Sequence, residues 1–115
     1  SRYSHGIEVP ANARWLYLSG QVAIRPDGSI PSDPREQHDV VWSNIKAILA
    51  EAGMGFGDVV RFNAYLVKPD LIPVYRAARD AALGDTLPAA STLVIVAALA
   101  NPQWLVEIEV VAAKA

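Results

Sequence analysis

The sequence predicts one α+β domain over residues 1–115, with a mixed sheet covered on one face by two helices. The length of 115 residues suits a single hydrophobic core. Two stretches repeat apolar residues at helical spacing, and the other periodic stretches are short and bounded by glycine or proline, which is typical of strands. The expected order is strands, helix, strand, helix, strands. Two helices are too few to cover both faces of such a sheet.

Residues 15–19, Trp-Leu-Tyr-Leu-Ser, predict the first long strand, and residues 21–24 are expected to continue it beyond an irregularity at Gly20. A short strand is expected before it, around residues 7–9. Residues 25–29, Arg-Pro-Asp-Gly-Ser, predict a turn because proline fixes φ and Asp-Gly accepts positive φ.

The first helix has clear start and stop signals. Asp33 is a good N-cap, Pro34 occupies the first helical position, and Glu36 is placed to close a capping box. Gly53 is expected to end the helix in a left-handed conformation. His38 lies on the buried stripe, as a hydrogen-bonded packing residue. The apolar members of that stripe are Val41, Ile45, Ile48 and Ala52.

The second helix is expected to begin at Asp70 as its N-cap, with Pro73 in its first turn and Gly84 at its end. Its apolar stripe comprises Leu71, Tyr75, Ala78 and Ala82. Tyr75 is therefore expected in the core.

Three further strands are expected at residues 59–67, 92–97 and 105–112. In the first of them, Arg61, Asn63 and Tyr65 alternate with apolar residues. In the last, Glu107 and Glu109 alternate with apolar residues in the same way. The uncovered face of the sheet therefore mixes charged and apolar side chains, which indicates a wet, partly buried interface between subunits.

The composition favours association between subunits and excludes several classes of site. Hydrophobic residues make up 52% of the chain and charged residues only 19%, more apolar surface than a domain of this size readily buries. The net charge of −2, with no basic cluster, weighs against nucleic-acid binding. Without cysteine there is no disulfide, zinc–thiolate site or thiol nucleophile. The apolar runs are too short to span a membrane, and the cytoplasm is the expected location.

Six short motifs, in order along nearly the whole chain, resemble the Rid/YjgF (reactive intermediate deaminase) family. They are Tyr-Ser-His at 3–5, Ser-Gly-Gln at 19–21, a helix pattern at 37–53, Asp-Val-Val with Tyr-Leu at 58–66, Pro-Ala-Ala-Ser-Thr at 88–92 and Val-Glu-Ile-Glu at 106–109. The resemblance implies a chorismate-mutase-like fold and a homotrimer with a barrel-like centre and three clefts between subunits. It also implies hydrolysis of enamines and imines to 2-keto acids and ammonia, without a metal or organic cofactor.

One position departs from the family pattern. The arginine that follows Pro-Ala in deaminating members, where it grips the substrate carboxylate, is Ala90 here. Alanine offers no charge and no hydrogen-bond donor, so the family's activity on short 2-imino acids does not transfer directly. Glu107 keeps the place of the family's acidic residue and is the catalytic candidate, as a general base or a group that positions water. The structural alternative is a salt-bridged strand residue near the trimer interface. Arg2, His5, Arg14 and Arg61 are the candidate cations for it.

The resemblance also suggests substrate-binding residues. Tyr3 and Ser19 match cleft positions of the family, and Ser91 and His5 lie close to such positions in the sequence. Each has a plain structural alternative: a frayed surface residue for Tyr3, backbone satisfaction at a strand break for Ser19, and a structural histidine for His5. Glu109 is expected to be structural or solvent-facing. Two histidines without suitable spacing argue against a metal site.

Three functions follow as hypotheses. The first is an imine or enamine hydrolase whose substrate has changed with Ala90. The second is a non-catalytic protein that binds a small metabolite in the same clefts. The third, an endoribonuclease or translation inhibitor, has the least support because the chain has no basic stripe and no pair of catalytic histidines.

Overall fold

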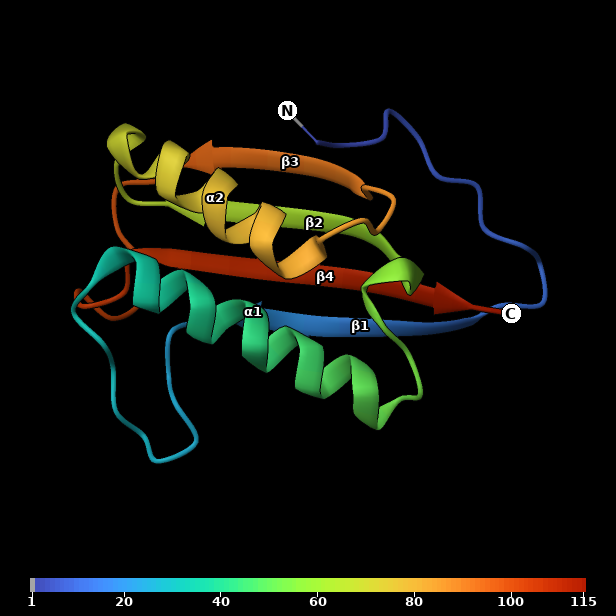
Figure 1. Cartoon of the computed structure of the whole chain (residues 1–115), viewed down its shortest axis with the longest axis horizontal. Helices are drawn as coiled ribbons and strands as arrows, with labels where there is room; N and C mark the ends of the chain where they lie inside the picture. Colours follow the sequence, from blue (N-terminus) through green and yellow to red (C-terminus); the bar gives the residue numbers. More distant parts are fainter. Residues whose placement is uncertain (1) are drawn as a thin grey trace.

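A four-stranded mixed sheet lies beneath two helices that pack on one of its faces (Figure 1). The computed structural model describes residues 2–115. The strands are β1 (Arg14–Gln21), β2 (Val59–Leu66), β3 (Ala90–Ile95) and β4 (Val106–Lys114), in the spatial order β1-β4-β2-β3. β4 pairs antiparallel with both β1 and β2, whereas β2 and β3 are parallel. The α+β class and the two helices on one face are confirmed.

Helix α1 (Pro34–Glu51) begins as the sequence predicts. The Asp33 carboxylate accepts a hydrogen bond of 2.9 Å from the Glu36 backbone N–H. The Glu36 side chain does not close a capping box, because its carboxylate accepts from Arg25 Nη2 at 3.0 Å instead. Gly53, just past the helix, has φ of +70°, a conformation that favours glycine.

Helix α2 (Ile72–Leu83) begins later than the sequence predicts. The cap predicted at Asp70 is wrong: a short 3₁₀ turn, η2 (Pro69–Leu71), intervenes, and no side chain caps α2. Pro73 lies in the first turn as expected, since the missing N–H costs nothing there. Gly84 ends the helix with φ of +53°.

The strand predictions fail mainly at the ends. No strand forms at residues 7–9, and the N-terminal segment touches the sheet through a single bridge between Ser4 and Ala90. Pro10 follows, and a proline N cannot donate to a ladder. Residues 22–24 are also outside the sheet, because β1 shifts its register against β4 after Leu18 and ends at Gln21. β3 begins and ends two residues earlier than the predicted 92–97.

The core lies between the helices and the covered face of the sheet. Alternate residues of β2 and β4, among them Phe62 and Ile108, pack against the apolar stripe of α1. Trp42 of α1 meets the Phe62 ring edge-to-face with centroids 5.1 Å apart. His38 is fully buried and its Nδ1 lies 2.7 Å from the Pro34 carbonyl oxygen, which confirms its packing role. Burial lowers the pKa of His38, which favours the neutral imidazole.

The opposite face of the sheet has no cover within residues 2–115 (Figure 1). Large apolar side chains lie exposed on it or at its edges: Tyr17 is 73% exposed, Trp15 51% and Val94 41%. The polar side chains predicted for this face, described below, lie among them. Neither helix in the described part of the chain combines the length and apolarity needed to cross a membrane.

Candidate functional site

Glu107 lies on the open face of the sheet, near the start of β4. Its side chain is half-buried, and in the ladder it stands opposite Tyr65 of β2. The carboxylate lies directly over Gly20 of β1, where even a single added Cβ would collide with Oε2. The Ser-Gly-Gln and Val-Glu-Ile-Glu motifs therefore meet in space. The sequence indicated Gly20 only as a strand irregularity. In the structure, the missing side chain of Gly20 leaves the space that the Glu107 carboxylate occupies, and we call this position the seat of Glu107.

The carboxylate of Glu107 makes no hydrogen bond or ion pair with any residue from 2 to 115. Glu109, two residues along the same face, differs sharply. Its Oε1 accepts from the Tyr65 hydroxyl at 2.6 Å and from Asn63 Nδ2 at 3.0 Å. The bonds from Tyr65 and Asn63 lower the pKa of Glu109, and the bond to Glu109 raises the pKa of Tyr65. Glu109 is therefore a fixed anion within a hydrogen-bonded network.

Arg61 extends this network towards β3. It is the ladder partner of Ala90, so its side chain lies beside the position where the family pattern has an arginine. Its Nε donates to Asn63 Oδ1 at 2.8 Å and its Nη2 donates to Thr92 Oγ1 at 2.5 Å. These neutral partners orient the guanidinium without neutralising it. Arg61 thus supplies a positive charge on the open face next to Ala90.

A single chain does not bring Ala90 and Glu107 together. Ala90 pairs with Arg61, which pairs with Val111 of β4, whereas Glu107 is opposite Tyr65. The two positions are therefore separated by four residues along β4, about 13 Å, in addition to the width of two strand spacings. A substrate as short as a 2-imino acid cannot touch both within one subunit.

Tyr3 and Ser91 lie close together on the helical side of the sheet, at its β3 edge. They line a pocket of about 150 Å³ together with Tyr75 and Arg79 of α2. Ser91 follows Ala90 on β3 and points to the helices, away from Glu107. The Tyr75 hydroxyl has no hydrogen bond of good geometry; burial raises its pKa, while Arg79 and Ser91 lower it by less. This pocket was missed from the sequence, where Tyr75 was expected to be core only.

Comparison with known proteins identifies the family of the chain and agrees with its fold. The family model described as Endoribonuclease L-PSP matches residues 1–114. The chain belongs to this family, which includes the Rid/YjgF proteins. A Rid family protein of unknown function from Yersinia pestis has a solved structure with a TM-score of 0.87 and 35% identity, covering 96% of this chain and 85% of that one.

Curated relatives of this Rid family chain match over shorter stretches. A RutC family protein of Pyrococcus abyssi is 39% identical over 66 residues, which is 56% of this chain and 50% of the relative. TdcF of Escherichia coli, described as a candidate reactive intermediate deaminase, is 29% identical over 65 residues, 56% of this chain and 48% of TdcF. The chain thus spans about half the length of the curated relatives it matches.

The remaining Rid-type positions lie in two places, Ser19 near Glu107, and Tyr3 with His5 beside Ala90 at the β3 edge of the sheet. Ser19 is exposed beside Gly20, at the Glu107 end. His5 and Tyr3 stack edge-to-face with centroids 5.3 Å apart, and the bridge between Ser4 and Ala90 holds them at the Ala90 end.

Two of the candidate cations are engaged elsewhere. Arg14 donates to the Ala52 carbonyl oxygen at 3.3 Å, and Arg2 pairs with Asp80 at 3.6 Å. Across residues 2–115, no three His, Cys, Asp or Glu side chains group as metal ligands.

Proposed function

We propose that this Rid family chain forms a homotrimer and hydrolyses an imine or enamine in clefts between subunits, with Glu107 as the catalytic carboxylate. The observation that supports this most is the state of Glu107, which is half-buried, seated on Gly20 and without a partner within residues 2–115. A carboxylate with free lone pairs can accept a proton from water. Water then adds to the C=N carbon of the imine, or of the imine tautomer of an enamine, and the proton passes from Glu107 to the nitrogen. The C–N bond breaks as the hydroxyl oxygen forms the carbonyl, and ammonia leaves with the nitrogen lone pair and the transferred protons.

The separation between Glu107 and Ala90 supports a cleft that two subunits complete. In the proposed trimer, Glu107 of one subunit faces Ala90 and Arg61 of the next. The exposed apolar residues Trp15, Tyr17 and Val94 supply the surface that such an interface would bury. Ser19 contributes a hydroxyl at the Glu107 end of the cleft. Tyr3 and His5 lie beside Ala90 at the sheet edge, whereas Ser91 points to the helical side and lines the pocket there with Tyr3.

The substrate is proposed to be an anion that differs from the short 2-imino acids. Ala90 cannot bind a carboxylate, but Arg61 is one strand away on the same face. A guanidinium displaced by one strand spacing, about 5 Å, suits a longer molecule or one with its carboxylate set further from the C=N bond. The resemblance to TdcF, described as a candidate reactive intermediate deaminase, supports the reaction class and not the substrate.

The decisive assay measures ammonia release from a panel of imines that an amino-acid oxidase generates in place. The wild-type protein is compared with Glu107→Gln and with Glu109→Gln as a matched control on the same strand face. Light scattering on the same samples gives the oligomeric state. The proposal predicts a trimer that is active in the wild type and in Glu109→Gln. A trimer that turns over no member of the panel would refute it.

Ala90 also favours a second candidate, a protein that binds a small metabolite in the same clefts without catalysis. Thermal shift against a metabolite library tests this candidate, since a ligand that binds only the native state raises the unfolding midpoint. This candidate would be favoured if the wild-type protein released no ammonia and the Ala90→Arg variant did. Turnover by the wild type would count against it.

The endoribonuclease activity named in the family's description has little support from the charges of this chain. The net charge is −2, and Arg61 is the cation placed on the open face beside Ala90. A basic stripe that tracks a phosphate backbone is the usual footprint of RNA binding. Incubation of the purified protein with labelled RNA tests this directly, and intact RNA is the expected result.

A further inference from the structure

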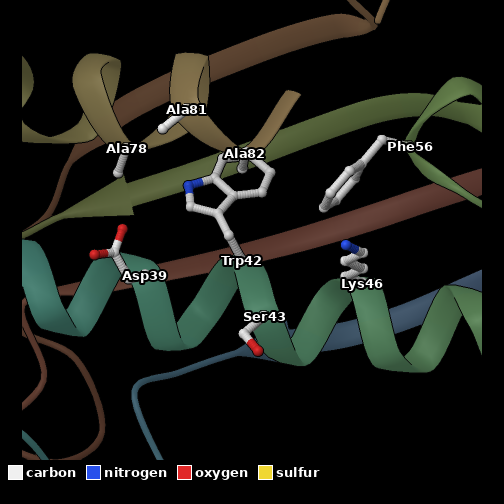
Figure 2. A pocket seen from close by; sticks show the side chains of 8 residues that line it. All are labelled: Asp39, Trp42, Ser43, Lys46, Phe56, Ala78, Ala81 and Ala82. Carbon is white, nitrogen blue, oxygen red and sulfur yellow. The ribbon is translucent and has the colours of Figure 1, made fainter. Parts of the chain in front are cut away.

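The outer surface of the helical layer has a hollow of about 370 Å³ between α1 and α2 (Figure 2). This volume falls in the range of about 300–1,000 Å³ that is typical of small-molecule sites. α2 contributes only Ala78, Ala81 and Ala82 to it, and these short side chains leave the space open. The rings of Trp42 and Phe56 form its other apolar walls. The hollow is on the opposite side of the sheet from Glu107.

Trp42 presents a buried polar atom at this hollow. The residue is 3% exposed, and its Nε1–H has no hydrogen-bond acceptor within the described chain. Figure 2 shows the nitrogen-bearing edge of the indole turned towards Ala78 and Asp39. A buried donor without an acceptor costs about 1–3 kcal/mol, so an acceptor bound at this point would relieve that cost. This donor distinguishes the hollow from a simple packing defect between two helices.

The two ends of the hollow carry opposite charges. Asp39 and Lys46 both line it from α1, and their separation of seven residues corresponds to two helical turns, about 10 Å. Asp39 binds Arg35 Nε through Oδ1 at 3.0 Å, which leaves Oδ2 available. Lys46 makes no ion pair with any residue of the described chain. A ligand of matching polarity has an anionic end at Lys46 and a hydrogen-bonding end at Asp39.

We propose that this hollow binds an aromatic organic acid with a hydroxyl group at the end opposite its carboxylate. The carboxylate pairs with Lys46. The ring packs over the alanines of α2 and against Trp42 and Phe56, whose own rings touch edge-to-face with centroids 6.0 Å apart. The hydroxyl accepts from Trp42 Nε1 and donates to Asp39. Because the indole nitrogen is covered, this hydrogen bond requires the side chains at the rim to move. The site is separate from the open sheet face and does not depend on the function proposed there.

The test uses 3-(4-hydroxyphenyl)propanoate as the probe on the full, ¹⁵N-labelled chain. The chain has three tryptophans, so the indole N–H region contains few signals, and the one lost in Trp42→Phe belongs to Trp42. We expect a saturable shift of the Trp42 signal at millimolar probe, with the Trp15 signal unchanged. A Trp42 signal that does not move, or one that moves together with that of Trp15, would overturn the proposal.

Variants and analogues test the ligand chemistry. Ala81→Leu fills the hollow from an exposed position, so folding is not at risk. This variant and Lys46→Met are each expected to weaken the probe's Kd by about tenfold or more, whereas Lys68→Met, remote from the hollow, leaves it unchanged. The amide of the probe and 3-phenylpropanoate, which lacks the hydroxyl, are expected to bind more weakly. Equal binding by Ala81→Leu, or by the amide, would contradict the assignment.

Discussion

Glu107 and Glu109 lie two residues apart on one face of β4, yet their surroundings differ completely. Glu109 is held by Tyr65 and Asn63, at 2.6 and 3.0 Å. Glu107 lies over Gly20 and accepts no hydrogen bond within residues 2–115. A carboxylate with its lone pairs satisfied contributes to structure, whereas one that is positioned but unsatisfied is available for chemistry. Strand alternation places both side chains on the same face of β4. Their surroundings differ because Glu109 contacts residues of β2, whereas Glu107 lies over Gly20 of β1.

The largest expected effect separates the two glutamates directly. Glu107→Gln keeps the shape of the side chain but loses the basic oxygen, so kcat should fall by about 100-fold or more. Glu109→Gln should change kcat only a few-fold. Ammonia release measures both, with light scattering as the check that each variant is still assembled. Equal losses in the two variants would remove the functional distinction between them.

A second prediction concerns the seat of Glu107. Gly20→Ala places a methyl group where the Glu107 carboxylate lies, and the flexible side chain should move aside with little loss of stability. Since a misplacement of about 1 Å can cost about 100-fold in rate, we expect a large fall in turnover. Gly57→Ala is the matched control, because nothing lies within 4 Å of an added Cβ there. Full activity in Gly20→Ala would show that the position of the carboxylate does not matter.

The third prediction concerns stability and is the smallest. Loss of the charged acceptor in Glu109→Gln should lower the free energy of unfolding by about 1 kcal/mol or less, since the site is near the surface. Tyr65→Phe, which removes one donor, should have part of this effect. Tyr17→Phe is the control, because the Tyr17 side chain is largely exposed. Chemical denaturation at neutral pH measures all three variants.

The same network predicts how this stability depends on pH. The pKa of Glu109 is lower in the folded chain than its ordinary value of 4.5. Its contribution is therefore complete above about pH 4.5 and is lost as the pH falls through the folded pKa. The difference in unfolding free energy between wild type and Glu109→Gln should shrink on acidification. A difference that grows below that pH would show that the sign is wrong.

Local signals in the sequence were sufficient for most of the fold. Asp33 with Pro34 starts α1 where predicted, and alternation along β2 and β4 identifies the buried and open faces correctly. The predictions failed where tertiary contacts decide. Asp70 looks like an N-cap in isolation, but the chain makes a 3₁₀ turn there first. The N-terminal segment has strand-like residues, yet it reaches the sheet edge only at Ser4.

The candidate site was predicted less completely, because its residues come from strands that are far apart in the sequence. Glu107 and Ala90 were identified from their motifs, but no local pattern shows that they lie about 13 Å apart along the sheet. The role of Gly20 depends on β1 pairing with β4, which joins residues far apart in the chain. The hydrogen bond from the Arg61 side chain to the Thr92 hydroxyl likewise depends on the parallel register of β2 and β3.

The most direct test of the account is a subunit complementation experiment. Trimers of Glu107→Gln lack the catalytic carboxylate and trimers of Arg61→Met lack the anion-binding group, so each alone should be nearly inactive. If one cleft takes Glu107 from one subunit and Arg61 from the next, randomly mixed trimers refolded from equal amounts of the two should regain about a quarter of the wild-type ammonia release. Mixed trimers that stay as inactive as their parents would contradict the shared cleft.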